Sequence, residues 1–373
     1  MAEAQPVTVV LYTDSSEPSG MGEHMLALGE TLHPIGGYKV LFACAPTPAG
    51  RAFLSRAEAL GLAALPIAAP GELSALLKQA HIDVFHMHAG IGWEGHEGIY
   101  RARDIGVPAI IRTEHLPYLL TDANQQHDYA QLVGHVDRLI CVSSEARDSF
   151  VRAGVPTDRI AVIRNGIIPT TAVAGHESLR AELGLPASSV ICLTVGRMTE
   201  QKGHAYLLHA IAQVIPLIPH AYFLWVGTGP LEAELQEKAR ALDLYKTEGR
   251  DRIYFLGRRD DVPRLIASSA LFVLPSLFEG LPLAVLEAMA SGLPIVATNV
   301  TGTREAIEDG VSGRLVPPCD SHELASAIIE ALTRPDLAET WGRNARQVMQ
   351  THFTAERMAH ETSRVYREAL AGI

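Results

Sequence analysis

The chain has 373 residues, enough for two domains of about 180 residues each. Its net charge of −11 disfavours a general nucleic-acid binder and gives no attraction to an anionic membrane surface. No apolar run approaches the roughly 18 residues that a membrane span needs, and the acidic start, Met1–Pro6, does not resemble a signal peptide. The four cysteines are scattered, which favours reduced thiols and a cytoplasmic protein.

The first 165 residues alternate apolar runs of strand length with helical patterns. We expect strands at 7–12, 38–44, 82–88, 107–112, 137–142 and 160–163. Helices are expected at 49–60 and after Ser143, whose side chain can cap a helix. Repeated strand–helix units predict a doubly wound parallel sheet.

Two features of this first half could bind a ligand. A glycine-containing turn, Pro18–His24, joins the first strand to a helical pattern. Such a turn can bring backbone N–H groups close to a ligand, but it can equally be a tight connection and nothing more. His86 and His88 alternate on one face of a strand. No third ligand follows them at metal spacing, so we expect no metal.

A second alternating series begins after residues 166–175, whose Thr, Ala and Gly indicate a linker. Strands are expected at 190–195, 222–226, 253–256, 271–274, 294–297 and 313–316. Three amphipathic helices are expected at 320–333, 337–349 and 355–370. The predicted organisation is a domain at 1–165, a linker at 166–175, a second domain at 176–334 and C-terminal helices at 335–373 that bridge back to the first domain.

The loop after the first strand of the second series carries two cations. Arg197 and Lys202 lie between Gly196 and Gly203, at the expected start of a helix. Backbone dipoles and cations together make an anion site, although a solvated loop is the alternative because most Lys and Arg are exposed. A Gly-x-Gly turn, Gly227–Gly229, ends the next strand and is a weak signal by itself.

The stretch Ser276–Thr298 predicts a loop, a helix and a strand in succession after the strand at 271–274. Glu279 lies at the tip of the loop with no charge partner beside it, and Glu287 lies just over one turn inside the helix. Such a loop follows the carboxyl end of a parallel strand, where these sheets bind ligands. A capping acid and a solvated helix glutamate are the alternative for each acid alone. The pair inside an apolar frame favours a binding site.

This stretch resembles the donor-sugar motif of the retaining glycosyltransferases of family 4. Glu279 and Glu287 stand as E-x7-E, followed by A-M-A-S-G-L-P-I-V-A-T. The pattern G-R-x4-K-G from Gly196 resembles the diphosphate clamp of the same family, in the matching order. Pro18–His24 is similar to the family loop G-G-x-x-x-H, with Ser19 in place of the first glycine. The resemblance covers essentially the whole chain and implies the GT-B fold, an α/β architecture in which two Rossmann-like domains face a cleft.

The resemblance implies a retaining hexosyltransferase that moves a sugar from a UDP- or GDP-sugar to a hydroxyl acceptor, with no metal and no other cofactor. It implies that Arg197 and Lys202 hold the diphosphate, that Glu279 contacts sugar hydroxyls and that Glu287 contacts the ribose. His115, in Thr113-Glu-His, matches the family histidine that faces the sugar from the first domain. The catalytic residues implied are therefore His115, Arg197, Lys202 and Glu279. The donor-binding residues implied are Gly20, Gly196, Arg197, Lys202, Gly227, Gly229, Arg258, Glu279, Gly280, Leu281, Pro282, Leu283 and Glu287.

Two other classes of function were weighed. A nicotinamide-dependent oxidoreductase would need G-x-G-x-x-G after a strand, with an acid about 20 residues later, and neither series has this. A non-catalytic nucleotide-sugar sensor or partner subunit stays open. The acceptor can be a small molecule, a glycan or a lipid-linked molecule. Residues 1–165 hold 12 Lys and Arg against 18 Asp and Glu, a net −6, which favours a soluble acceptor.

Overall fold

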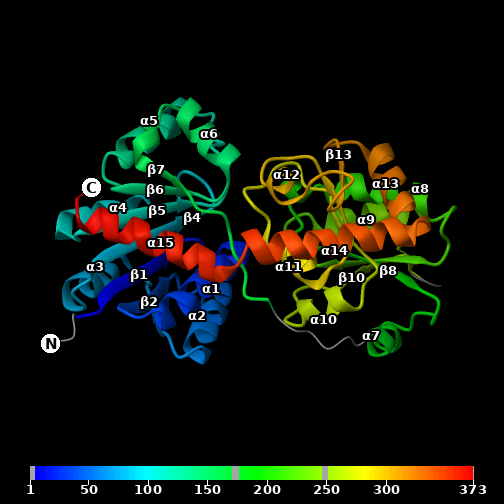
Figure 1. Ribbon diagram of the computed structural model, residues 1–373, viewed down its shortest axis with the longest axis horizontal. Coiled ribbons are helices and arrows are strands. Elements are labelled where there is room, and N and C mark those ends of the chain that lie inside the picture. Colours follow the sequence, from blue (N-terminus) through cyan, green and yellow to red (C-terminus); the bar gives the residue numbers. More distant parts are fainter. Residues whose placement is uncertain (1–4, 170–175, 246–250, 373) are drawn as a thin grey trace. The chain divides into compact units, whose positions relative to one another are not determined.

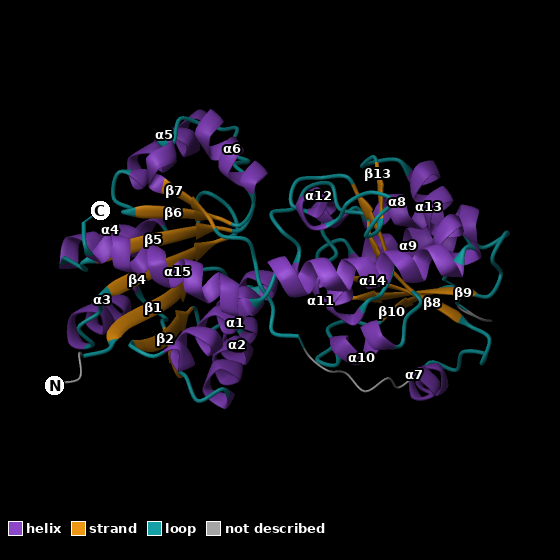
Figure 2. Cartoon of the chain, in the orientation of Figure 1, coloured by secondary structure: helices purple, strands orange, loops and turns teal. Residues whose placement is uncertain are grey.

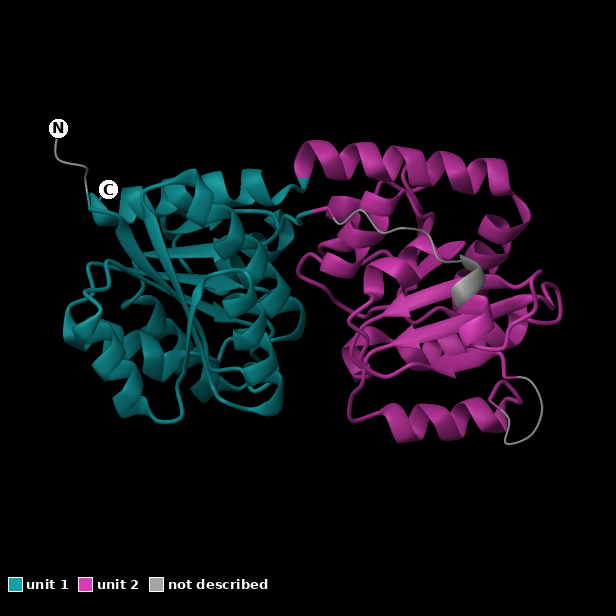
Figure 3. Ribbon diagram, turned by 90° about the horizontal axis from the view of Figure 1, so that it is seen from below, with its two compact units in different colours: residues 1–168, 353–373 teal, residues 169–352 magenta. Residues whose placement is uncertain are grey.

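The computed structural model describes residues 5–169, 176–245 and 251–372. Their contacts divide the chain into two compact units, Met1–Ile168 with Phe353–Ile373 (unit 1) and Pro169–His352 (unit 2) (Figure 3). Most of the predicted linker, 170–175, lies outside the described residues. The predicted C-terminal segment 335–373 is divided between the units, because its first helix packs in unit 2 and its second in unit 1.

Unit 1 is one parallel sheet covered by helices on both faces (Figure 1). Its strands are β1 (Val7–Thr13), β2 (Tyr38–Cys44), β3 (Ala63–Pro66), β4 (Val84–Ala89), β5 (Ala109–Glu114), β6 (Arg138–Cys141) and β7 (Ile160–Val162). Its helices are α1 (Ser19–Ile35), α2 (Pro48–Ala59), α3 (Pro70–Gln79), α4 (His96–Ile105), α5 (Ala123–Val133), α6 (Ser144–Arg152) and α15 (Ala355–Leu370). Ser143 caps α6 as expected, by accepting a hydrogen bond from the Ala146 N–H.

The period of a strand explains the two cores of unit 1. Alternate residues of β1 point to opposite faces of the sheet. Val9 and Leu11 join the core that includes residues of α1, α2 and α15, whereas Val10 and Tyr12 join the core that includes residues of α3, α4 and α5. Both faces are therefore buried, which is why the strands read as continuous apolar runs in the sequence.

Unit 2 repeats this architecture with a second parallel sheet (Figure 2). Its strands are β8 (Val190–Val195), β9 (Ala221–Val226), β10 (Ile253–Phe255), β11 (Leu271–Leu274), β12 (Ile295–Thr298) and β13 (Arg314–Val316). Its helices are α7 (His176–Glu182), α8 (His204–Val214), α9 (Glu232–Ala241), α10 (Val262–Ala267), α11 (Leu283–Ser291), α12 (Thr303–Ala306), α13 (Ser321–Thr333) and α14 (Pro335–His352). The prediction of two doubly wound parallel-sheet domains is confirmed.

The strand order shows where each sheet can bind a ligand. Unit 1 runs β3-β2-β1-β4-β5-β6-β7, and unit 2 runs β10-β9-β8-β11-β12-β13. The direction of winding reverses between β1 and β4 in unit 1 and between β8 and β11 in unit 2. Ligands of open α/β sheets bind at such switch points, outside the carboxyl ends of the strands. The loops after these four strands are therefore the places to examine for a site.

One local expectation was wrong. Residues 18–24 were predicted as a turn that precedes the helix, but α1 begins at Ser19, so that Gly20 and His24 lie in its first turns. Pro18 has φ −56° and ψ −34°, angles that suit a helix start, and its carbonyl accepts from the Gly22 N–H at 2.9 Å. Ser19 has φ +39°, in the left-handed region that favours glycine. This backbone angle gives a physical reason for the glycine that the family motif has at this position.

Candidate active site

Two loops meet at the switch point of unit 2. The first follows β8 and contains a short 3-10 turn at Glu200–Lys202, and the second lies between β11 and α11. Gln201 joins the two loops through one hydrogen bond that it donates and one that it accepts. Its side-chain amide donates to the Phe278 carbonyl at 3.1 Å, and its backbone carbonyl accepts from the Leu277 N–H at 2.7 Å. These bonds fix the register of one loop against the other.

Two glycines permit the close approach of these loops to their neighbours. Gly203 has φ +63°, and a Cβ there would lie 2.0 Å from the Pro275 carbonyl oxygen. Gly227 has φ +128°, and a Cβ there would lie 2.1 Å from the Gly196 carbonyl oxygen. Any side chain would force the backbones apart, because a carbon and an oxygen cannot approach that closely. Packing therefore requires glycine at positions 203 and 227, whatever these loops bind.

An ion pair joins the two loops. Lys202 Nζ lies 2.5 Å from Glu279 Oε1, and the Ser276 hydroxyl donates to the same oxygen at 2.7 Å. The two charged side chains are only 18% and 5% exposed. Thr298, at the end of β12, donates its hydroxyl to the Ser276 carbonyl at 2.5 Å and so supports Ser276. Oε1 has two donors, whereas no hydrogen bond within the described residues reaches Oε2.

Two features of this arrangement are not apparent from the sequence. Glu279 has no charged residue beside it in the sequence, but Lys202, 77 positions earlier, is its partner because β8 and β11 are neighbours in the sheet. Ser276 and Thr298 were seen only as the ends of the motif. A hydroxyl at the end of each of two neighbouring parallel strands was the signal that could have suggested their contact.

Apart from Gly20 in α1 of unit 1, the other donor-side residues of the prediction lie on loops or helix starts of unit 2. Gly280, Leu281 and Pro282 are buried, and Pro282 is the residue before the first turn of α11. Leu283 begins that helix, and Glu287 lies half-buried just over one turn inside it. The free N–H groups of a helix start favour an anion. The structure therefore provides an electropositive helix end beside Lys202 and Glu279.

The remaining cations have different surroundings. Arg197 is exposed on the loop after β8, and Arg258 is exposed on the loop after β10. The neighbour of Arg258, Arg259, forms ion pairs with Glu182 and Asp261 and so has a structural role. Gly196, Gly227 and Gly229 lie in the loops after β8 and β9. The structure thus brings Lys202 and Glu279 into contact and places the other predicted donor residues on segments of the same unit, except Gly20, which lies in α1 of unit 1.

Four histidine rings of unit 1 lie near the carboxyl ends of β4 and β5, namely those of His24, His86, His88 and His115. His86 is hydrogen-bonded to Tyr366 at 2.6 Å and to Thr113 at 2.7 Å. His88 Nδ1 lies 3.1 Å from Nε2 of His115, the half-buried ring that the resemblance implies at the sugar. Burial holds the pKa values of His86, His88 and His115 well below the usual range of histidine, because it disfavours the charged form. These three rings are therefore neutral at physiological pH.

The search along the sequence found no third metal ligand near His86 and His88, but the fold supplies more. His24, from α1, and His115, just after β5, both approach His88. One ligand atom from each of His24, His88 and His115 lies within 4.8 Å of the others. The reason is topological, because β1, β4 and β5 are adjacent strands and the segments that follow them meet at one edge.

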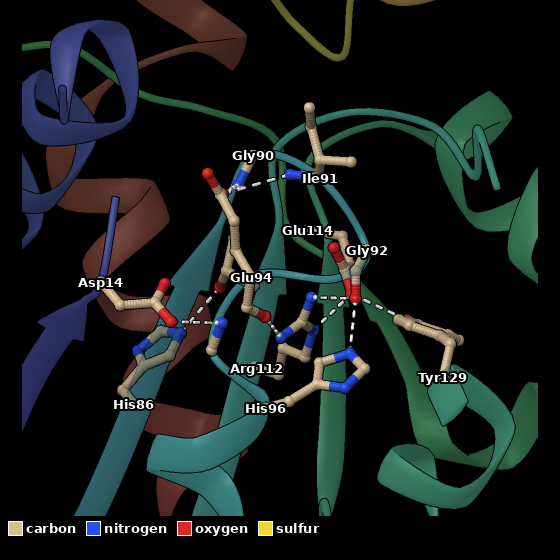
Figure 4. Close-up of polar contacts among 12 residues, drawn as sticks. Asp14, His86, Gly90, Ile91, Gly92, Glu94, His96, Arg112, Glu114 and Tyr129 are labelled. Carbon is tan, nitrogen blue, oxygen red and sulfur yellow. Dashed lines mark hydrogen bonds and ion pairs between the residues drawn. The ribbon is translucent and has the colours of Figure 1, made fainter. Parts of the chain in front are cut away.

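A buried ion pair organises the loop between β4 and α4 (Figure 4). Arg112 Nε lies 2.5 Å from Glu114 Oε1, and neither side chain is more than 1% exposed. The Tyr129 hydroxyl donates to the same oxygen at 2.7 Å. Arg112 also donates to the carbonyls of Glu94 at 2.6 Å and Gly92 at 3.3 Å. A buried pair persists only when further hydrogen bonds satisfy it, and here those bonds hold the loop.

Further contacts hold the same loop from its other side (Figure 4). The Glu94 carboxylate accepts from the N–H groups of Gly90 at 2.6 Å and Ile91 at 3.2 Å. Asp14, from the loop after β1, accepts from the Gly95 N–H at 2.8 Å. The two loops at the switch point of unit 1 are therefore fastened to each other, as they are in unit 2. The sequence analysis did not single out these residues.

Comparisons with known proteins agree with this geometry. A model of the family "Glycosyltransferase Family 4" matches residues 18–170, and one of "Glycosyl transferases group 1" matches residues 189–334. The chain belongs to glycosyltransferase family 4. It is a glycosyltransferase with the GT-B fold, as the sequence motifs predicted.

Two relatives illustrate the range of the family. The chain is 28% identical over 306 residues to the UDP-Gal:alpha-D-GlcNAc-diphosphoundecaprenol alpha-1,3-galactosyltransferase of Escherichia coli, covering 78% of this chain and 76% of the relative. It is 28% identical over 302 residues to the alpha-D-kanosaminyltransferase of Streptomyces kanamyceticus, covering 76% and 77%. These two glycosyltransferases carry different names for donor and acceptor, so they do not decide the substrates of this chain.

Solved structures share the fold over nearly the whole length. Anabaena Alr3699/HepE, in complex with UDP and glucose, is 21% identical and has a TM-score of 0.83, covering 97% of this chain and 100% of that one. Sucrose-phosphate synthase from Thermosynechococcus elongatus is 23% identical with a TM-score of 0.78, covering 98% and 100%. In the residues that the structure describes, no helix combines the length and apolar character needed to cross a bilayer.

The first testable prediction concerns His204, the first residue of α8 beside the Lys202 loop. Its ring packs against Trp225, and neither ring nitrogen has a hydrogen-bond partner among the described residues. Burial, followed by the charge of Lys202, lowers its pKa to about 4. The unfolded chain therefore binds a proton near pH 6.5 that the folded chain does not, so stability falls as pH falls from about 6.5 toward 4. At pH 5 this loss is about 2 kcal/mol.

We expect His204→Phe to be at least as stable as the wild type at pH 7 and to lose less stability on acidification. Urea unfolding at pH 7 and pH 5 measures both quantities, and the wild type is the reference for the carboxylates that also titrate. Parallel stability curves for the two proteins would contradict this account of His204.

Proposed function

We propose that this glycosyltransferase moves a hexose from a UDP- or GDP-sugar to a hydroxyl acceptor, with retention of anomeric configuration and without a metal ion. The observation that carries the proposal is the set Lys202, Ser276 and Glu279 at the switch point of unit 2, beside the start of α11. A buried carboxylate for hydroxyls and an ammonium for phosphate lie in contact there. This is the pair of chemistries that a nucleoside diphosphate sugar presents.

In this proposal the diphosphate is bound by the cations and by the N–H groups at the start of α11. The Lys202 ammonium has three donors, and one of them is used by Glu279. The other two, with exposed Arg197 and the N–H groups of α11, can stabilise a phosphate that becomes more negative as the sugar leaves. Glu287, on the same helix, is the proposed ribose contact.

In this proposal the sugar is bound by Glu279. Lys202 and Ser276 hold Oε1, so the carboxylate keeps one orientation and offers Oε2 to a sugar hydroxyl. This is a positioning role, and it differs from that of a nucleophile at the anomeric carbon. The bond from the anomeric carbon to phosphate breaks with its electron pair on the diphosphate. The acceptor oxygen then bonds to that carbon on the same face and passes its proton to the departing phosphate oxygen.

Other features support the choice of substrates and compartment. The Escherichia coli relative is named for UDP-Gal, and the Anabaena structure holds UDP and glucose, which favours a UDP-hexose donor. The net charge of −6 over residues 1–165 favours a soluble acceptor. Cys44, Cys141 and Cys192 are free and buried, which supports a reducing compartment such as the cytoplasm.

The most direct test of the donor is a thermal-shift screen against UDP-, GDP- and ADP-sugars, followed by transfer assays. A donor at 100 times its dissociation constant stabilises the folded protein by about 2.7 kcal/mol. We expect stabilisation by a UDP- or GDP-hexose and turnover that depends on an acceptor. Binding without any transfer across an acceptor panel would instead favour a nucleotide-sugar sensor.

Replacing the lysine of the ion pair tests the proposed diphosphate site. We expect Lys202→Ala to lower the turnover number about 100-fold or more, because one preorganised charge stabiliser is lost at the departing diphosphate. Arg197→Ala is expected to act in the same direction. Lys238→Ala is the matched control, since Lys238 forms an exposed ion pair with Glu234 within α9. Near-normal turnover of Lys202→Ala would rule out this assignment.

Metal independence makes a separate prediction. The chain contains no Asp-x-Asp sequence of the kind that holds a divalent ion on a diphosphate in some glycosyltransferases. Cations and a helix start can supply the same charge stabilisation. We expect the transfer rate to survive excess EDTA. Complete loss with EDTA, reversed by Mg²⁺ or Mn²⁺, would overturn this part of the proposal.

A further inference from the structure

Three imidazole rings of unit 1 face one another in a compact triangle. His24 comes from α1, His88 from the end of β4 and His115 from just after β5. The ring centroids lie 5.3 Å apart for His24 and His88, 4.7 Å for His24 and His115, and 5.4 Å for His88 and His115. Three rings at nearly equal spacing are the arrangement that one central ion requires.

The nitrogen positions suit such an ion. His88 Nδ1 and His115 Nε2 lie 3.1 Å apart. Two nitrogens that each lie about 2.1 Å from a tetrahedral zinc ion are roughly 3.4 Å from one another. One ligand atom of each of the three histidines lies within 4.8 Å of the other two. One pair of nitrogens therefore already lies near the spacing of a zinc site, and the set of three lies within 4.8 Å.

The surroundings of His24 point the same way. His24 donates its Nδ1–H to the Asn165 side-chain oxygen at 2.9 Å, which leaves the lone pair on Nε2. Ligating histidines almost always give their other N–H to such an acceptor, because the bond fixes the tautomer and the ring orientation. His88 Nε2 is buried with no hydrogen-bond partner among the described residues. The ligand atom of His88 is therefore Nδ1, which faces His115, and an ion bound there leaves Nε2 without a partner.

We propose that His24, His88 and His115 bind one divalent transition-metal ion of the zinc type, with a fourth position open to water or an anion. Imidazole ligands suit Zn²⁺, Ni²⁺ or Cu²⁺, whereas Mg²⁺ prefers oxygen ligands. His24 and His88 are buried, and His115 is the ring of the three that is partly exposed.

The site has a functional consequence, which rests on the proposed function. His115 is the ring that the family resemblance implies at the sugar, and a nitrogen bound to zinc cannot also hydrogen-bond to a sugar hydroxyl. We therefore expect bound Zn²⁺ to inhibit transfer, and we expect a chelator to preserve or raise the activity. An inhibitory ion on histidines is compatible with a transfer step that needs no metal.

Titration of the untagged, metal-free protein with Co²⁺ tests the ion site, because tetrahedral cobalt gives strong visible absorption bands. We expect one Co²⁺ per chain, displaced by Zn²⁺. His88→Gln and, separately, His115→Gln should weaken binding by about tenfold or more, since each removes a ligand. His115 is only half-buried, so its variant retains the fold more readily than that of fully buried His88, and circular dichroism checks both.

His209→Gln, an exposed histidine of α8, is the matched control, because the chain has 16 histidines that could bind ions non-specifically. Unchanged binding in both ligand variants, equal weakening in the control, or no tetrahedral spectrum would overturn the site. Zn²⁺ inhibition of wild-type transfer, reversed by EDTA, gives the second readout. Zinc that binds at the three histidines without inhibiting transfer would leave the ion site standing and contradict the assignment of His115 to the sugar.

Discussion

The contact between Lys202 and Glu279 is the interaction on which the proposed chemistry depends. It links the loop after β8 to the loop after β11, at the point where the winding of the unit 2 sheet reverses. The pair is largely buried, so separating it would leave a charge without compensation. Ser276 and Thr298 extend the network to β12, which makes the carboxylate part of the sheet edge rather than of a free loop. A positioned carboxylate is what a sugar-binding role requires.

In unit 1 a different buried ion pair holds the loops at the switch point. Arg112 and Glu114 are buried on β5, and their hydrogen bonds reach the loop after β4. Asp14 connects that loop to the loop after β1. In both units an ion pair therefore sets the shape of a switch-point loop. The difference is in what remains available, because unit 2 presents a carboxylate oxygen and an ammonium, whereas unit 1 presents neutral imidazoles.

The sequence was informative where a pattern is local. Buried parallel strands read as apolar runs, so β1, β2, β8 and β11 were predicted within one or two residues. β3 was missed because its residues, Ala63–Pro66, are mostly exposed and include none of the β-branched or aromatic residues that are typical of strands. The E-x7-E and G-R-x4-K-G motifs indicated the donor residues by resemblance.

What the sequence could not supply is contact between distant segments. Lys202 and Glu279 are separated by 77 positions, and His24 is separated from His115 by far more than any local motif spans. Only the order of the strands brings such residues together. The left-handed φ of Ser19 is likewise a property of the folded backbone, since serine itself does not signal it.

The central claim is that Glu279 positions the sugar and does not attack it. The most direct test is the anomeric configuration of the product, followed by NMR, together with a chemical rescue of Glu279→Ala by azide. We expect the wild type to retain the configuration, and we expect the variant to stay inactive in azide with no glycosyl azide formed. An inverted product, or a glycosyl azide from the variant, would show that the protein supplies a base or a nucleophile and would contradict the mechanism.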